Sequence, residues 1–342
     1  MNLLRLPGLI DCHVHLREPG ATHKEDFTTG TKAAIAGGIT TVIDMPNNPK
    51  PTTTLFRIKE KIKLATKKSL CPVFFYLGAN KDNINEFEKC FSKVKGLKVY
   101  MNSTTGPLLI EKLEVLEKIF RLWPRAKPIL VHAEDSTVAK VIGLVSLWRK
   151  PVHFCHISQA CEIELIKKAK DEGLPITCEV SPHHLFLNEK EGKKLGPFAL
   201  VKPPLRSPAD VKALWKYLKF IDCFATDHAP HTKEEKLSAN PPSGLPGLET
   251  ALPLLLTAVK EGRMTIKDII LRYHDNPAKI FKISQPKTTY TEVDLDQKWE
   301  IKNENLFTKC AWSLFNGWQI RGKLKRVFIK GKKVFENGEF IR

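Results

Sequence analysis

The stretch Asp11-Cys12-His13-Val14-His15 decides how the rest of this chain is interpreted. It ends a short apolar run, residues 9–15, which predicts a β-strand. Side chains two positions apart on a strand share a face, so His13 and His15 are expected to point the same way. Two convergent imidazoles are a ready pair of metal ligands. Such a pair also occurs in protein cores, so this pattern alone does not establish a metal site.

Seven further apolar runs follow, which predict strands at residues 40–45, 73–79, 97–101, 129–132, 152–156, 176–180 and 221–226. Apolar periodicity near 3.6, as in residues 108–122 and 162–170, predicts helices between them. Eight strand–helix units are the number that closes a (β/α)8 barrel of the TIM type, so an α/β barrel is the predicted fold. A doubly wound open sheet is the alternative. It is disfavoured because no glycine-rich phosphate-binding turn follows any strand.

The pattern changes after about residue 285. Residues 290–295, 299–301, 325–329 and 333–335 look like β-strands, with turn signals at Gly331 and at Asn337-Gly338. We therefore predict a barrel domain of residues 8–285. A small β-rich C-terminal subdomain of residues 286–342 should pack on the barrel, together with residues 1–7.

Three further candidate metal ligands and one lysine stand at the same end of other predicted strands. They are Lys98, His132, His156 and Asp227. Catalytic groups of barrel enzymes lie at the carboxyl ends of the strands. Histidine nitrogens suit zinc, and an aspartate can both bind a metal and carry a proton. The convergence of these residues with the His13–His15 pair predicts a zinc centre.

Two longer motifs resemble those of a known family. Residues 7–20 (PGLIDCHVHLREPG) resemble the opening motif of dihydroorotases, residues 226–231 (TDHAPH) resemble their second signature, and residues 247–250 (GLET) also fit. The two motifs together are specific, whereas either alone is shared with allantoinases and hydantoinases. The resemblance covers nearly the whole chain. It is greatest to the dihydroorotase domain of the animal-type multifunctional polypeptide that also carries carbamoyl-phosphate synthetase and aspartate transcarbamoylase.

The resemblance implies two zinc ions bridged by a lysine that is carboxylated on its side-chain nitrogen. The implied ligands are His13, His15 and Asp227 for one zinc, His132 and His156 for the other, and Lys98 as the bridge. A lysine ammonium has no lone pair for a metal, whereas its carbamate is an anionic oxygen donor. The carboxylation of Lys98 is therefore what the resemblance adds to the residue pattern.

The resemblance also implies an additional zinc, with Cys155, Glu179 and His13 as ligands. Side chains alternate along a strand, so Cys155 and His156 are expected on opposite faces. We therefore expect Cys155 to stand apart from the zinc pair. The other seven cysteines include no CxxC pair and are expected to be reduced core thiols.

The implied reaction is the reversible cyclisation of N-carbamoyl-L-aspartate to L-dihydroorotate in de novo pyrimidine biosynthesis. The zinc pair lowers the pKa of a water to about 7, and Asp227 carries a proton between that water and the ring nitrogen. Both reactants are anionic small molecules. Arg17, Asn47 and His231 are the expected contacts of their carboxylates.

Two positions depart from the animal-type pattern. Lys202 stands where those domains have arginine. Lysine keeps the positive charge but lacks the planar guanidinium that can form two parallel hydrogen bonds to a carboxylate, so this substrate contact should be weaker. Thr104 matches the loop that covers the site in the relatives. The aromatic residue that follows it there is replaced by Thr105, which removes apolar cover from the loop.

Composition limits the partners. The net charge is +18, but the basic residues are spread among apolar ones without an aromatic stripe, so no nucleic-acid partner is expected. No run approaches the ~18 apolar residues of a membrane span, and residues 1–7 lack a signal-peptide pattern. We expect a cytoplasmic homo-oligomer, a dimer. Only twelve residues precede His13, which favours one domain of a longer multifunctional polypeptide.

Two other functions stay open at this point. Another cyclic-amide hydrolase, of the allantoinase or hydantoinase/dihydropyrimidinase type, would keep the metal ligands. It would lack Arg17 and the spacing from Asp227 to His231. A non-catalytic scaffold domain should have lost ligands, and all six candidates are present here.

Overall fold

A computed structural model describes residues 3–104 and 106–341. The predicted effect of Thr105 on the loop therefore falls outside the described residues. Within the described ranges, no helix is both long and apolar enough to cross a membrane.

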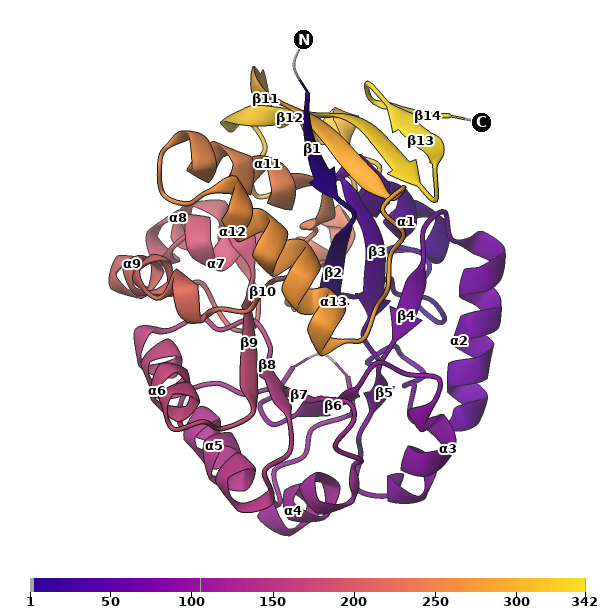
Figure 1. The fold of residues 1–342 in the computed structure, drawn as a ribbon, viewed down its shortest axis with the longest axis vertical. Coiled ribbons are helices and arrows are strands. Elements are labelled where there is room, and N and C mark those ends of the chain that lie inside the picture. The colour runs from indigo at the N-terminus through magenta and orange to yellow at the C-terminus, as the bar shows by residue number, and fades with distance from the viewer. Residues whose placement is uncertain (1–2, 105, 342) are drawn as a thin grey trace.

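Parallel strands in chain order form the wall of a barrel, with helices around the outside (Figure 1). They are β2 (Leu9–Val14), β3 (Ile39–Asp44), β4 (Val73–Phe75), β5 (Leu77–Gly78), β6 (Leu97–Tyr100), β7 (Ile129–His132), β8 (Val152–Phe154), β9 (Ile176–Val180) and β10 (Cys223–Phe224). The predicted strand 73–79 is interrupted at Tyr76, so β4 pairs with β3 while β5 pairs with β6. The ring closes where the His15 amide donates to the carbonyl of His228 at 2.7 Å. The predicted barrel is confirmed.

The helices that follow the strands lie on the outside of the barrel (Figure 1). The longer ones are α1 (Phe27–Ala36), α2 (Leu55–Lys68), α4 (Leu113–Leu122), α5 (Ser136–Trp148), α6 (Ala160–Asp171), α9 (Pro208–Lys216) and α11 (Leu248–Lys260). The predicted helix 162–170 lies within α6. Only the second part of predicted helix 108–122 is helical, because Leu109 forms a parallel bridge with Tyr100 instead.

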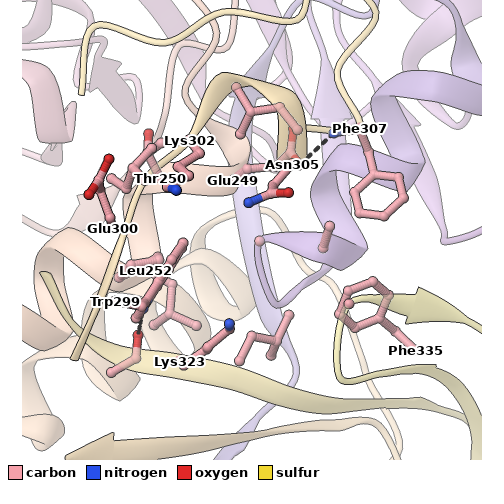
Figure 2. Close-up of a pocket in the computed structure, with 18 of the residues that line it drawn as sticks. Glu249, Thr250, Leu252, Trp299, Glu300, Lys302, Asn305, Phe307, Lys323 and Phe335 are labelled. Carbon is pink, nitrogen blue, oxygen red and sulfur yellow. Dashed lines mark hydrogen bonds between the residues drawn. The ribbon is translucent and has the colours of Figure 1, made fainter. Parts of the chain in front are cut away.

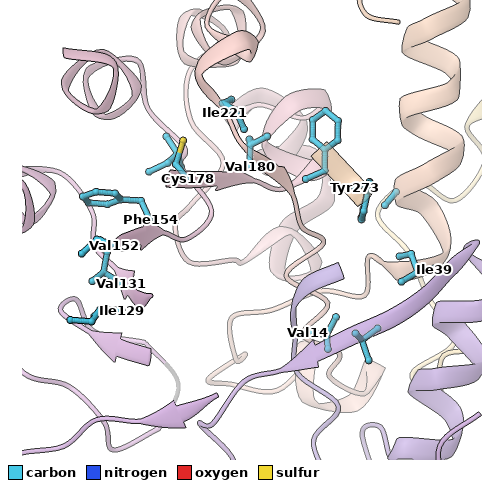
Figure 3. Close-up of a cluster of buried hydrophobic side chains, with 14 of the residues drawn as sticks. Val14, Ile39, Ile129, Val131, Val152, Phe154, Cys178, Val180, Ile221 and Tyr273 are labelled. Carbon is cyan, nitrogen blue, oxygen red and sulfur yellow. The ribbon is translucent and has the colours of Figure 1, made fainter. Parts of the chain in front are cut away.

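Two apolar clusters lie on the two sides of the barrel wall. Val131, Phe154 and Cys178 belong to the larger cluster, which also contains helix residues such as Ile163 of α6 (Figure 3). Leu130 belongs to a second cluster, which Cys12, Tyr76, Cys155, Cys223 and Phe281 share. Neighbouring residues of a strand face opposite sides, so the Leu130 cluster lies inside the barrel. The interior is thus packed, except where polar side chains enter it.

The C-terminal strands form a separate antiparallel sheet. Its order is β1 (Leu4–Pro7), β11 (Tyr290–Glu300), β12 (Gln319–Ile329), β13 (Lys332–Glu336) and β14 (Glu339–Phe340). Lys330 and Gly331 both have positive φ, 52° and 82°, as a two-residue type I′ hairpin requires. The predicted β-rich sheet is confirmed, with one difference. Residues 290–295 and 299–301 belong largely to one strand, β11, whose pairing is irregular between Asp294 and Lys298.

A cavity of about 610 Å³ lies between α11 and this sheet (Figure 2). Trp299 and Lys323 line it from the sheet, and Glu249 lines it from α11. The Glu249 carboxylate accepts hydrogen bonds from the amides of Phe307 and Thr308, and burial raises its pKa to about 8. None of the predicted site residues lines this cavity, so it lies away from the predicted metal centre.

A buried ion pair joins α2 to the end of β3. Lys61 Nζ lies 2.5 Å from Asp44 Oδ2 and donates to the Met45 carbonyl at 2.8 Å, and both charged side chains are 1% exposed. Removing one partner of a buried pair leaves an uncompensated charge. We expect Lys61→Ala to lower the free energy of unfolding by about 3–5 kcal/mol in denaturant titrations. Lys63→Ala, at an exposed position of the same helix, should change it by less than about 0.5 kcal/mol. Equal effects of the two substitutions would contradict the prediction.

Candidate metal centre

The carboxyl ends of the barrel strands bring the predicted ligands together. The ring of His13 lies 5.3 Å from that of His15 and 5.2 Å from that of His156, centre to centre. His132 and His156 are 4.5 Å apart. Asp227 Oδ1 lies 3.3 Å from His13 Nε2 and 3.1 Å from His15 Nε2. Five predicted ligands from four strands therefore form one buried cluster.

Three residues of this region have left-handed backbone conformations. Arg17, His156 and Asp227 have φ values of 62°, 35° and 48°. Such conformations cost roughly 1–3 kcal/mol each for residues other than glycine, and they persist only where the surrounding structure enforces them. They cluster at functional sites. Here they aim side chains inward just beyond the point where each strand has ended.

Two of the histidines are oriented by a second polar group. His15 Nδ1 contacts Asn47 Oδ1 at 2.8 Å, and His13 Nδ1 contacts Glu179 Oε1. When Nδ1–H donates in both rings, each Nε2 offers a lone pair to a metal ion on the side that faces Asp227. Metal-ligating histidines are held in this way in proteins. The structure thus places Asn47 against His15.

The electrostatics of the cluster favour a cation at its centre. Burial alone lowers the pKa of His13, but the carboxylates of Glu179 and Asp227 raise it to about 10. Burial alone would raise the pKa of Asp227, yet His13 and His15 hold it well below its usual range. The two carboxylates therefore stabilise positive charge at the position of His13. A divalent metal supplies such charge.

The donor set fits zinc. One candidate ligand atom each from His13, His156 and Asp227 lies within 4.8 Å of the others. Burial and the nearby His132 and Lys98 lower the pKa of His156 well below its usual range, so this imidazole is neutral. Its Nδ1 is buried and has no hydrogen-bond partner within the described ranges. A neutral imidazole and a carboxylate are suitable zinc ligands.

Lys98 and Cys155 lie on the same side of this cluster. Lys98 is fully buried, and its Nζ lies 2.8 Å from Cys155 Sγ. Cys155 also groups with His13 and Glu179, with candidate ligand atoms within 4.8 Å of one another. The expectation that Cys155 faces away from His156 is therefore wrong. Strand β8 ends at Phe154, and the positive φ of His156 breaks the alternation.

Four of the five predicted substrate contacts, all but His231, line two small cavities beside the cluster. One, of about 100 Å³, is lined by residues that include His15, Arg17 and Asn47. The other, of about 30 Å³, is lined by these three and by Thr104, Lys202 and Asp227. Lys202 Nζ also donates to the Ser103 carbonyl at 2.8 Å, which ties it to the loop that carries Thr104.

Arg17 and His231 contact each other at the edge of these cavities. Arg17 Nε donates to the Pro230 carbonyl at 3.1 Å, and its Nη2 lies 3.1 Å from His231 Nε2. Burial and the cations Arg17 and Lys24 lower the pKa of His231 to about 2, so this histidine is neutral. Arg17 is thus a cationic group at the edge of these cavities, as an anionic ligand requires.

The sequence analysis missed several residues of this site. His132 Nε2 lies 3.0 Å from Glu134 Oε1, and Glu134 pairs with Arg206 at 3.1 Å. Among the residues that the structure describes, the buried Nε2 of His183 has no hydrogen-bond partner, and the surroundings of His183 include His13 and Asp227. The position of His183 directly after strand β9 was an available signal. The link from Glu134 to Arg206 spans distant loops and had none.

Comparison with known proteins agrees with this geometry. The sequence profile of the amidohydrolase family matches residues 4–105. The chain is 48% identical to the multifunctional protein CAD of Squalus acanthias over 99% of its own length, but it spans only 15% of that protein. It is 39% identical to a dihydroorotase of Pyrococcus furiosus, over 98% of this chain and 82% of the relative.

Solved structures share the fold. An L-hydantoinase (dihydropyrimidinase) from Arthrobacter aurescens superposes with a TM-score of 0.94 and 26% identity, over 99% of this chain and 87% of that one. An inactive dihydroorotase-like domain of a CAD-like multifunctional protein from Chaetomium thermophilum gives 0.86 and 28%, over 100% and 97%. The similarity to the archaeal enzyme extends over most of both chains. This chain belongs to the dihydroorotase family of amidohydrolases.

Proposed function

We propose that this chain is a zinc-dependent dihydroorotase that interconverts N-carbamoyl-L-aspartate and L-dihydroorotate. The observation that carries the proposal is that Arg17, which contacts His231, lines the same small cavity as His15 and Asp227. A candidate metal cluster and a cationic group thus line the same small cavities. A cyclic amide that carries a carboxylate needs both features. Hydrolysis of dihydroorotate by the purified chain, and its loss on treatment with a chelator, test the proposal.

His13, His15 and Asp227 would hold one zinc, and His132 and His156 the other. Zinc at such a site acts as a Lewis acid and lowers the pKa of a water toward neutrality. Lys98 would bridge the pair as a carbamate. A buried ammonium is costly unless it is paired, and within the described ranges no carboxylate lies within ion-pairing distance of Lys98. Its hydrogen-bond partner there is the thiol of Cys155.

Asp227 would carry the proton of the reaction. In hydrolysis it takes a proton from the attacking water and delivers it to the leaving ring nitrogen, and in cyclisation it does the reverse. Its lowered pKa means that the carboxylate is ionised and has oxygen lone pairs available. Arg17 would bind the substrate carboxylate through its guanidinium, with Asn47, His231, Lys202 and Thr104 around it.

An additional zinc at His13, Cys155 and Glu179 is part of the proposal. Their candidate ligand atoms lie within 4.8 Å of one another, and all three side chains are buried. A thiolate, an imidazole and a carboxylate are suitable zinc ligands.

Arg17 distinguishes this proposal from a hydantoinase-type activity. Each charge-assisted hydrogen bond contributes roughly 1.5–3 kcal/mol, so Arg17→Ala should lower kcat/KM on dihydroorotate by about 10- to 150-fold. The loss on dihydrouracil, a neutral ring, should be small, and zinc content should not change. Arg57→Ala on helix α2 is the control. Steady-state kinetics on both rings measure the effect, and an equal loss on the two would refute the carboxylate contact.

The scaffold alternative has one structural observation in its favour, the similarity to an inactive domain. All six candidate metal-binding residues are nevertheless present here, and the five imidazole and carboxylate ligands lie in one cluster. We therefore favour the enzyme.

The wider context also belongs to the proposal. The chain would be one domain of a longer cytoplasmic polypeptide, in keeping with the 15% of the Squalus protein that it spans. It would form a dimer, and its barrel domain would end near residue 285. Its ligand would be an anionic small molecule and not a nucleic acid.

A further inference from the structure

Three other metal-binding side chains lie together inside the barrel. Cys12 comes from β2, His153 from β8 and Cys223 from β10, and all three are fully buried. One candidate ligand atom from each lies within 4.8 Å of the others. None of the three belongs to the zinc pair or to the His13–Cys155–Glu179 group. From the sequence, Cys12 and Cys223 were predicted only to be core thiols. They lie far apart in the chain, and only the folded barrel brings them together.

Glu179 offers a fourth donor to this group. Its Oε2 lies 3.3 Å from Cys12 Sγ and 3.1 Å from His153 Nε2. With Zn–S bonds of about 2.3 Å and Zn–N or Zn–O bonds of about 2.0–2.1 Å, a tetrahedral site has S–O edges of about 3.5 Å and N–O edges of about 3.3 Å. The two observed separations are close to these edges. The donors therefore need little movement to enclose one ion.

The second nitrogen of His153 has a partner typical of a metal-ligating histidine. Nδ1 lies 2.8 Å from Thr177 Oγ1, and this hydroxyl donates to the Val152 carbonyl at 3.3 Å. With its proton used in this way, Thr177 would accept from Nδ1–H, which leaves the Nε2 lone pair beside Glu179 available to a metal ion. A lone pair opposite a carboxylate oxygen is repulsive unless a cation lies between them.

The surroundings favour a tightly held ion. Cys12 and Cys223 belong to the apolar cluster inside the barrel, and the ring of Phe281 lies 5.4 Å from that of His153. An apolar shell excludes water and strengthens the attraction between a cation and thiolates. Glu179 lies between this group and the candidate metal cluster that contains His13, because its Oε1 faces His13 while its Oε2 faces Cys12.

We propose that Cys12, His153, Cys223 and Glu179 bind a structural zinc ion inside the barrel. On binding, the two thiols release their protons to solvent, His153 binds as the neutral imidazole, and Glu179 binds as the carboxylate. Four protein ligands leave no open position, which is the arrangement of a structural site. The ion would join β2 and β10, where the barrel closes, to β8 and β9. This site does not depend on the proposed enzymatic function.

Metal analysis of the purified chain and its cysteine variants tests this site. Cys12→Ala and Cys223→Ala should each contain one zinc fewer per chain than the parent. Cys178→Ala is the matched control. Cys178 precedes Glu179 in the sequence, and its buried thiol belongs to the larger apolar cluster on the outer side of the barrel wall. Equal zinc in Cys12→Ala and Cys178→Ala, with both folded by circular dichroism, would overturn the proposal.

Two measurements do not require the loss of Cys12. The cobalt-loaded Cys155→Ala variant should keep a thiolate-to-cobalt charge-transfer absorption, since Cys12 and Cys223 remain. X-ray absorption of the zinc-loaded parent should show more sulfur neighbours than Cys155 alone provides. The absence of both signals would overturn the site. Two thiols that titrate only after reduction would overturn it in favour of a Cys12–Cys223 disulfide. Dihydroorotate turnover is not a readout here, so failure of this site leaves the proposed activity standing.

Discussion

Asp227→Asn should abolish turnover of dihydroorotate while the chain remains folded. The amide has nearly the shape of the carboxylate, but it can neither take a proton from water nor return it to the ring nitrogen. Loss of a general acid–base group typically lowers the rate by about 10²- to 10⁴-fold. Asparagine is also a weaker metal ligand than aspartate, so the loss should lie at the upper end of that range. Steady-state kinetics in both directions, with thermal melts, measure it.

Asp222→Asn is a matched control for this substitution. Asp222 lies just before β10, and its carboxylate pairs with Lys170 and accepts from the Cys178 amide, away from the metal cluster. Its replacement should leave kcat within a few-fold of the parent. Asp227→Asn with activity within threefold of the parent would remove Asp227 from the proton-transfer role.

Much of the barrel could be predicted because each strand is a separate apolar run. The runs are strands in the structure: β9 has the predicted bounds, whereas β3 differs from its prediction by one residue at each end. The interruption at Tyr76 and the two-residue length of β10 could not be predicted. Both depend on which neighbour each strand pairs with as the sheet curves, and local sequence does not record that choice.

The positions of the site residues follow from the strand ends, but their orientations do not. His13 and His15 were expected on one face, and both contact Asp227. Cys155 was expected on the wrong face, because strand alternation assumes that the strand continues through His156. Glu134 follows β7 and His183 lies in the short helix α7 (Pro182–Phe186) after β9, and the strand pattern predicts the direction of neither side chain. The sequence thus predicts which reactive residues stand at the strand ends, whereas the directions of their side chains depend on the backbone conformation.

Lys98→Ala should lower zinc content and activity together. If the carbamate of Lys98 bridges the zinc pair, its removal deletes a ligand of both ions. Loss of a group that merely supports a ligand costs roughly 10- to 100-fold in metal affinity or activity, so loss of the bridge should cost more. Lys93→Ala, at an exposed position shortly before β6, is the control and should retain both properties. Metal analysis and dihydroorotate kinetics on the same samples measure the two losses.

The role of the Lys98 carbamate can be separated from that of a positive charge. Lys98→Arg keeps a cation at the position but forms no carbamate, so it should fail as Lys98→Ala does. Reloading of the metal-depleted parent with zinc should be faster in the presence of bicarbonate, because carbon dioxide must add to the neutral amine before the bridge forms. In the two variants bicarbonate should have no effect. A Lys98→Ala protein that binds two zinc ions and turns over normally would show that the bridge does not exist.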